Sequence, residues 1–371
     1  MNVLYIFDRD SSDRPESTMI ITLSKMGVKP TVICAPNTPF EAALQKAEIA
    51  TLPVNFRSKI DLRAIGQIRT LLHSKSFDLV HIFHKKPLVN YTFASIGIKL
   101  PVVAYRGIIG NLSYWDPFSW LSFLNPRINR IICVCEAVRR YFLEKRFLLF
   151  FSLFNPNRVV TIHKGHETAW YAQPEKPNFS EIGIPENAYV IGCVARLKAR
   201  KGIVELIRSL EYIKADKPVY LILIGRVEDK RIPGEIEKSP LKPQIKLLGF
   251  RKDASMLAGG FDCVALPSLR REGLPRAIIE AMSQGIPAVV TDSGGSPELV
   301  RDEIDGQIVA PGDIKALADG LSWVLADSDR HAQLSRNAKA RIEKDFTVKK
   351  TADETLRLYG QILQEKNSRN G

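Results

Sequence analysis

Short, almost continuously apolar runs alternate with helical stretches along most of the chain. Runs of Val, Ile, Leu and Phe without polar alternation are typical of strands in a parallel sheet that is covered on both faces. Helical stretches such as 17–26 and 62–74 separate these runs, so the sequence predicts an α/β layer fold built from βαβ units. The first half contains seven predicted strands, at residues 3–7, 31–35, 49–54, 78–83, 101–105, 130–135 and 158–163.

The composition of the sequence changes at residues 172–186, where prolines are frequent and apolar residues are few. This composition indicates a linker. A second series of βαβ units then begins, so we expect two α/β domains. Ligands bind beyond the carboxyl ends of strands in open α/β sheets, and the natural site is a cleft between the two domains. The second series has predicted strands at 189–195, 219–225, 245–248, 263–267, 286–291 and 307–310, and predicted helices at 202–210, 276–283, 314–325, 330–344 and 348–363.

The net charge indicates a partner that carries phosphate. Lys and Arg number 53 and Asp and Glu number 40, which gives a formal net charge of +13. Such an excess fits nucleic acid, an anionic membrane face or a phosphorylated ligand. Composition alone leaves these three partners open.

The apolar runs, the first residues and the cysteines indicate in which cellular compartment the protein is expected. The longest apolar block, at 147–154, is far shorter than the ~20 residues that a spanning helix needs, so no span is expected. The first residues, MNVLYIFDRD, lack the basic region of a signal peptide. The five cysteines are scattered, which is typical of reduced, buried thiols in a cytoplasmic protein.

The strongest candidate site is the sequence REGLPRAIIE at residues 271–280, directly after a predicted strand. Pro275 fits the first helical position, and the open N–H groups after it, with the helix dipole, favour an anion. Glu272 and Glu280 are expected on the order of 10 Å apart at 1.5 Å per helical residue, too far for the acid and base of a hydrolase. The pattern fits a nucleotide sugar, with hydroxyls at both ends and phosphate between them, or else a solvated helix with two surface glutamates.

Two further loops after strands are compatible with phosphate. Arg196 and Lys201 stand in the loop RLKARKG, at a strand end and a helix start, from which both can reach one anion; the alternative is an exposed basic loop. Gly294 and Gly295, in SGGSPE, let the backbone approach a ligand closely. Three such loops in one domain favour a shared phosphorylated ligand.

Together these loops resemble the nucleotide-binding half of the GT-B glycosyltransferases, specifically the retaining family 4 (glycosyltransferase group 1). The pattern is Arg-Leu with Lys-Gly after the first strand, a Glu-x7-Glu loop and helix, and a Gly-Gly-x-Pro-Glu loop, in matching order over 190–315. The resemblance implies two Rossmann-like domains facing across a cleft, with the acceptor bound by 1–170 and the nucleotide sugar by 171–345. The segment 346–371 resembles the family's helix that crosses back to the first domain.

The resemblance implies a role for each matched residue. Arg196 and Lys201 would hold the donor diphosphate and stabilise the leaving nucleotide in place of a metal ion. Glu280 would accept from the ribose hydroxyls, and Glu272 would contact the hydroxyls of the donor sugar. The leaving phosphate would take the acceptor's proton on the front face, so no protein nucleophile is expected. The other implied donor contacts are the backbone near Gly273 and Leu274 for sugar and phosphate, near Phe250 and Arg251 for the base, and at Gly294 and Gly295.

The first domain fits the family less well. Its first strand is followed by DRDSSDR, without the family's paired glycines. Where many members carry a histidine, after the strand at 101–105, this chain has Arg106, which becomes the candidate catalytic residue near donor sugar and acceptor. His81 and His84 flank the preceding strand end and are interpreted as packed or surface histidines. The Asp-x-Asp pattern at 8–10 matches metal-dependent transferases, but the GT-B architecture argues against a metal, so neither a metal nor another cofactor is expected.

A basic and aromatic segment predicts a membrane partner. Residues 127–164 hold eight Lys or Arg, two Glu and several Phe, and the part at 139–154 is the densest. Cations beside Phe and Leu favour an anionic membrane surface. The alternative is a buried helix with a basic rim.

The sequence therefore predicts a retaining glycosyltransferase that moves a sugar from a UDP- or GDP-linked donor to a glycan or lipid-linked acceptor, in cell-envelope polysaccharide or lipopolysaccharide biosynthesis. We expect it in the cytoplasm, attached to the inner face of the cytoplasmic membrane. Two alternatives are a UDP-GlcNAc 2-epimerase of the same fold and a basic nucleic-acid-binding protein. The Glu272 and Glu280 pattern disfavours the first, and the lack of a nucleic-acid-binding module disfavours the second.

Overall fold

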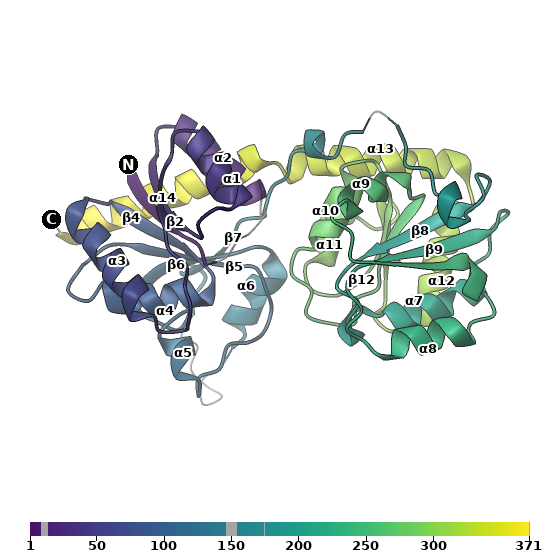
Figure 1. Cartoon of the computed structure of the whole chain (residues 1–371), viewed down its shortest axis with the longest axis horizontal. Helices are drawn as coiled ribbons and strands as arrows, with labels where there is room; N and C mark the ends of the chain where they lie inside the picture. Colours follow the sequence, from purple (N-terminus) through teal and green to yellow (C-terminus); the bar gives the residue numbers. More distant parts are fainter. Residues whose placement is uncertain (9–13, 146–153, 174, 371) are drawn as a thin grey trace. The chain divides into compact units, whose positions relative to one another are not determined.

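A computed structural model of the chain describes residues 1–8, 14–145, 154–173 and 175–370 (Figure 1). It contains two compact units: unit 1 comprises Met1–Gly165 and Val348–Gly371, and unit 2 comprises His166–Thr347. The chain thus crosses between the units at 165/166 and 347/348, close to the predicted boundaries at 170/171 and 345/346.

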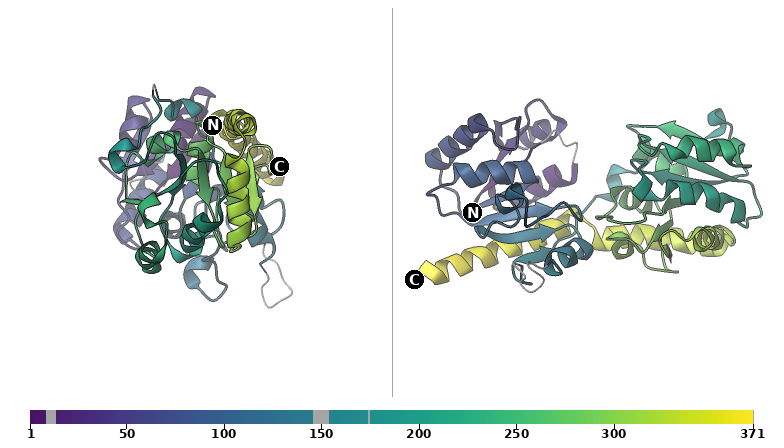
Figure 2. Two further views of the ribbon diagram at one scale, coloured as in Figure 1. Left: turned by 90° about the vertical axis from the view of Figure 1, so that its right-hand side faces the viewer. Right: turned by 90° about the horizontal axis from the view of Figure 1, so that it is seen from below.

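Unit 1 is a seven-stranded parallel sheet with helices on both faces (Figures 1 and 2). Each predicted strand of the first half overlaps one of its strands. The strands, in sheet order, are β3 (Ala50–Pro53), β2 (Lys29–Cys34), β1 (Asn2–Ile6), β4 (Leu79–Phe83), β5 (Val102–Arg106), β6 (Ile128–Cys133) and β7 (Val159–Thr161). The helices are α1 (Arg14–Lys25), α2 (Pro39–Lys46), α3 (Leu62–Ser74), α4 (Lys85–Ala94), α5 (Pro117–Trp120), α6 (Glu136–Leu143) and α14 (Val348–Asn370).

Unit 2 repeats this architecture with a six-stranded sheet, and all its strand pairs are parallel. The predicted α/β fold is therefore confirmed in both units. The strands, in sheet order, are β10 (Ile245–Gly249), β9 (Val219–Ile224), β8 (Tyr189–Val194), β11 (Cys263–Leu266), β12 (Ala288–Thr291) and β13 (Gly306–Val309). The helices are α7 (Ile203–Ser209), α8 (Arg231–Lys238), α9 (Ala254–Leu257), α10 (Arg276–Met282), α11 (Ser296–Leu299), α12 (Ile314–Leu325) and α13 (Ser328–Asp345).

The strands of unit 2 are apolar at successive positions because both faces of the sheet are buried. On β9, Ile222 points into one apolar core, with α10 and α13, whereas its neighbours Leu221 and Leu223 point into the other, with α7 and α12. The predicted linker is not a free connection. Phe179 and Ile184 are buried in the first of these cores, so this proline-rich segment is part of unit 2.

Helix α14 packs against α1 and is fixed to the sheet of unit 1 by a buried hydrogen bond. The Tyr359 hydroxyl lies 2.6 Å from Nδ1 of His81 on β4, and 3.4 Å from the hydroxyl of Tyr5 on β1. Burial lowers the pKa of His81 to about 3, so its ring is neutral at physiological pH. His81 is therefore a packed histidine of the core.

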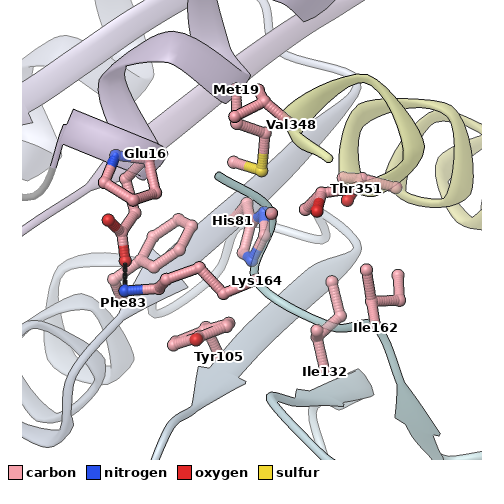
Figure 3. A pocket seen from close by; sticks show the side chains of 13 residues that line it. Glu16, Met19, His81, Phe83, Tyr105, Ile132, Ile162, Lys164, Val348 and Thr351 are labelled. Atoms are coloured by element: carbon pink, nitrogen blue, oxygen red, sulfur yellow. Dashed lines mark ion pairs between the residues drawn. The ribbon is translucent and has the colours of Figure 1, made fainter. Parts of the chain in front are cut away.

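A small cavity lies beside His81, between the sheet of unit 1 and helices α1 and α14 (Figure 3). An ion pair between Glu16 and Lys164 lies along its wall. The cavity encloses about 20 Å³, which is the room that one water molecule needs. A sugar or a nucleotide does not fit in a space of this size.

Candidate functional site

The order of strands in unit 2 reverses between β8 and β11, which lie side by side. Loops that follow strands on the two sides of such a reversal diverge and leave a crevice at the carboxyl edge of the sheet, where ligands of open α/β sheets bind. The basic loop RLKARKG follows β8, and the loop that contains Glu272 follows β11. The two loops with the strongest sequence patterns thus leave adjacent strands, at the edge where such a crevice is expected.

The loops after β8 and β11 are in direct backbone contact. The amide of Leu269 donates to the carbonyl of Arg200 at 2.8 Å. Gly202 has a φ of +69°, and a Cβ there would lie 2.0 Å from the carbonyl oxygen of Pro267. Glycine is therefore required at 202 by both its backbone conformation and the close approach of the second loop.

Lys201 and Glu272 form the centre of the site. Nζ of Lys201 donates to Oε2 of Glu272 at 2.7 Å, and both side chains are buried. The same Oε2 accepts a second hydrogen bond, also 2.7 Å, from Oγ of Ser268. A buried carboxylate with a charged and a neutral donor is well stabilised. The lysine that the sequence assigns to the diphosphate thus lies against the glutamate that it assigns to the sugar.

The third loop, after β12, is packed against the backbone of Glu272. The amide of Gly295 donates to the carbonyls of Glu272 and Gly273. Gly294 has a φ of +61°, and a Cβ there would lie 1.9 Å from the carbonyl oxygen of Glu272. The paired glycines therefore position the Glu272 loop from the side of β12.

Two more arginines border this centre. Nη1 of Arg200 lies 3.8 Å from Oε2 of Glu272 and donates to the carbonyl of Arg271. Arg196 lies at the end of β8 with its side chain exposed. The crevice is therefore lined by more positive than negative charge, which favours an anionic ligand.

Glu280 lies on α10 and is buried. Its carboxylate accepts from Nε of Arg276 at 2.5 Å, and burial raises the pKa of Glu280 against the opposing effect of Arg276. Helix α10 begins at Arg276, as the predicted range 276–283 has it, but Pro275 is the residue before the helix and not its first helical residue. A carboxylate held by one arginine is still able to accept hydrogen bonds from ligand hydroxyls.

The remaining predicted donor contacts lie along the same edge of the sheet or beside it. Phe250 follows β10 and is 70% exposed. Arg251 forms a two-pronged ion pair with Asp253. Leu274 packs against the core of unit 2 beside α10, which fixes the backbone next to Glu272.

Arg106 lies in unit 1, at the end of β5, and serves the loop that follows. Its guanidinium donates to the carbonyls of Ile108 and Gly110 and lies 4.8 Å from the ring centre of Phe123. Burial lowers the pKa of Arg106. In this structure Arg106 shapes the loop after β5, a role that the sequence analysis did not foresee.

His84 follows β4 with a φ of +77°, an unusual value for a residue other than glycine.

The basic segment of unit 1 differs in part from its predicted role. Phe142 and Phe154 are buried in the core, and Arg139 donates to Glu136 and to the carbonyl of Val159, so these residues are not offered to a membrane. Residues 146–153 lie outside the described part of the chain. Arg140 is exposed.

Two exposed tryptophans were not foreseen from the sequence. Trp115 is 85% exposed and Trp120 39%. They join the basic segment through Tyr114, whose carbonyl accepts from Trp120 and whose hydroxyl donates to the carbonyl of Lys145. Both lie in or next to α5, which Figure 1 shows at the edge of unit 1 below α4.

Other hydroxyl side chains of the site were also missed. The sequence analysis predicted neither the hydrogen bond from Ser268 to Glu272 nor the one from Thr291 to Ser268. In the second, Oγ1 of Thr291 donates to the carbonyl of Ser268 at 2.6 Å. The available signal was a hydroxyl residue at the carboxyl end of each of two buried strands.

Within the described ranges, no three His, Cys, Asp or Glu side chains group as metal ligands. No described helix is both long and apolar enough to span a bilayer.

Two family profiles match the chain: "Glycosyl transferases group 1" over residues 175–341 and "Glycosyltransferase Family 4" over residues 18–170. The UDP-Gal:alpha-D-GlcNAc-diphosphoundecaprenol alpha-1,3-galactosyltransferase of Escherichia coli is 23% identical, over 86% of this chain and 84% of that protein. The capsular polysaccharide biosynthesis glycosyltransferase CapM of Staphylococcus aureus is 28% identical, over 82% of each. The crystal structure of Anabaena Alr3699/HepE in complex with UDP-glucose matches with a TM-score of 0.73 at 22% identity, over 99% of this chain and 100% of that one.

The contact between the Gly294 loop and Glu272 predicts a large effect of one methyl group. Gly294→Ala should lower the free energy of unfolding by the cost of a left-handed alanine, about 1 kcal/mol, plus about 1–3 kcal/mol for overpacking. Gly249→Ala is the matched control, because Gly249 has a φ of +66° but no atom within 4 Å of the added Cβ. Urea denaturation of both variants measures the difference, and equal losses would show that the predicted clash does not exist.

Proposed function

The chain belongs to the glycosyl transferases of group 1 and has their GT-B fold. We propose that it is a retaining transferase of cell-envelope polysaccharide or lipopolysaccharide biosynthesis. Its donor is a UDP- or GDP-linked sugar and its acceptor a glycan or a lipid-linked glycan. The observation that carries the proposal is the buried Lys201 and Glu272 pair at the strand reversal of unit 2.

The donor diphosphate is assigned to the cationic side of this crevice. Lys201 comes from the loop after β8, Arg196 stands at the end of that strand, and Arg200 lies beside Glu272. Cations held in place before the ligand arrives stabilise charge that develops on a leaving nucleotide without reorganisation at the moment of reaction. Lys201 and Arg196 therefore stabilise the leaving diphosphate.

The hydroxyl-bearing ends of the donor are assigned to the two carboxylates. Glu280 accepts from the ribose, and Glu272 accepts from the sugar ring. The bond between the anomeric carbon and the phosphate oxygen breaks, a bond to the acceptor oxygen forms on the same face, and the leaving phosphate takes the acceptor's proton. The names of the relatives leave both nucleotides open, since one is a UDP-Gal-dependent enzyme and another is a GDP-mannose-dependent mannosyltransferase.

The acceptor is assigned to the carboxyl edge of the unit 1 sheet, where Arg106 holds the loop after β5 and His84 follows β4. We assign no metal or other cofactor to the reaction, because Lys201 and the arginines supply the charge. The two alternatives, an epimerase of the same fold and a nucleic-acid-binding protein, gain no support from the matched families and relatives.

We also propose that the protein acts in the cytoplasm at the inner face of the membrane, through the edge of unit 1 around α5. Trp115 and Trp120 present large apolar surface next to Tyr114, and Nζ of Lys145 lies 5.4 Å from the ring centre of Tyr114. Tryptophan is favoured at the boundary between water and lipid, and cations near an anionic leaflet add about 1 kcal/mol each. The name of one relative specifies a diphosphoundecaprenol acceptor, and an acceptor of that kind would lie at such a surface.

Lys201→Ala should weaken binding of UDP or GDP and lower kcat/KM for sugar transfer by about 100-fold or more, since one charged contact to a phosphate is worth about 1.5–3 kcal/mol and the leaving group gains more in the transition state. Lys198→Ala is the control, because Lys198 stands in the same loop but pairs with Glu228 and not with Glu272. The measurement is nucleotide release with a panel of nucleotide sugars, together with calorimetry of UDP and GDP. Equal, mild effects of both changes would contradict the diphosphate assignment.

Transfer should be independent of divalent metal, because protein cations neutralise the leaving diphosphate. Dialysis of the active protein against EDTA should leave the rate of nucleotide release unchanged. Complete loss of activity that magnesium or manganese restores would contradict the assigned roles of Lys201 and Arg196.

Wild type should sediment with phosphatidylglycerol-rich liposomes, and high salt should weaken but not abolish this binding, because salt screens charges but not apolar contacts. Trp115→Ser with Trp120→Ser should release the protein while UDP affinity stays unchanged. Tyr212→Ser is the control, since Tyr212 is an exposed aromatic of unit 2. Wild type that ignores these liposomes would contradict the membrane proposal.

A further inference from the structure

Glu272 depends on two donors of different chemical kinds. Both hydrogen bonds that the structure shows for its carboxylate go to Oε2, one from Nζ of Lys201 and one from Oγ of Ser268, each at 2.7 Å. The lysine carries a charge that other anions compete for, whereas the serine hydroxyl carries none. The two donors therefore respond differently when an anionic ligand enters the crevice.

We propose that Ser268 is a positioning residue that keeps the Glu272 carboxylate in place when Lys201 turns from Glu272 to the diphosphate of the donor. This inference rests on the proposed function, because it concerns the same donor site. A diphosphate carries more negative charge than one carboxylate, so it draws the Lys201 ammonium toward itself. Without a second donor, the buried carboxylate of Glu272 would then lose its main partner, which is costly at low dielectric.

Ser268 is suited to this role because nothing that binds in the crevice reaches it. Its side chain is completely buried, and its hydroxyl hydrogen is used by Oε2 of Glu272. Its carbonyl accepts from the buried Oγ1 of Thr291 at 2.6 Å, so the end of β12 fixes the serine backbone. The next residue, Leu269, donates to the loop after β8. The position of Ser268 is thus set by the fold and not by the ligand.

The proposed role of Ser268 affects how the donor sugar is bound and not how the nucleotide is bound. When Ser268 donates to Oε2, the orientation of the Glu272 carboxylate is fixed. Its other oxygen, Oε1, is then available to a hydroxyl of the donor sugar. A nucleoside diphosphate without a sugar makes no use of that oxygen. Loss of Ser268 should therefore impair the intact donor and leave UDP or GDP binding nearly unchanged.

The test compares Ser268→Ala with Ser209→Ala, a control in which the serine is equally buried and donates only to the carbonyl of Leu206. We expect Ser268→Ala to lower kcat/KM for the nucleotide sugar by about 10- to 100-fold, the range for one hydrogen bond to a charged group. The Kd of UDP or GDP, measured by calorimetry, should change by less than about twofold, and the control should match wild type in both.

A second comparison separates positioning from simple packing. Ser268→Cys keeps the side-chain volume but donates only weakly, so it should behave like Ser268→Ala, and it replaces that variant if the alanine fails to fold. In a Glu272→Gln background, Ser268→Ala should change the Kd of the intact nucleotide sugar by less than about threefold, because residues that act through each other are not additive.

The outcomes are distinct. A wild type that transfers no sugar from any nucleotide sugar overturns the proposed function itself. An active wild type whose kcat/KM survives Ser268→Ala overturns only the positioning role, and so does an undiminished loss in the Glu272→Gln background. A Ser268→Cys variant with full activity would show that volume matters and the hydrogen bond does not.

Discussion

The parallel pairing of β8 with β11 is the constraint on which the site of unit 2 depends. Cys263 pairs with Ile191 and Val264 with Gly192, so the two strands end at the same edge of the sheet. The loops that leave them are in backbone contact, and Lys201 on one loop donates directly to Glu272 on the other. The ion pair at the centre of the site therefore follows from strand order as much as from the two side chains.

Glycines allow the loops to come close enough for this contact. A side chain at Gly202 would collide with the carbonyl of Pro267, and one at Gly294 with the carbonyl of Glu272. The site is thus a set of three backbone segments in contact, with side chains emerging from fixed positions. Such a framework suits electrostatic catalysis, which requires charges that are positioned before the reaction begins.

The same architecture is used differently in the two units. In unit 2 the residues at the strand ends meet one another in a polar cluster, whereas in unit 1 Arg106 is engaged by the loop after its own strand. The buried His81 and Tyr359 pair belongs to the attachment of α14 and not to a site.

The amino-acid sequence by itself determined the fold class and the donor loops. The sequence predicted each of the thirteen strands in the described residues. Several were predicted from apolar runs without alternation, because burial on both sheet faces leaves a signal that needs no knowledge of neighbours. The loops that hold Lys201, Glu272 and Gly294 were found because phosphate chemistry requires basic residues and glycines near strand ends.

Only the tertiary structure decided how those residues are paired. That Ser268 donates to Glu272, that Phe142 is core and Trp115 exposed, and that Arg106 holds its own loop all depend on contacts between segments far apart in the chain or on side-chain direction. Local patterns carry no information on such contacts, because burial and partner choice are set when sheets and helices pack.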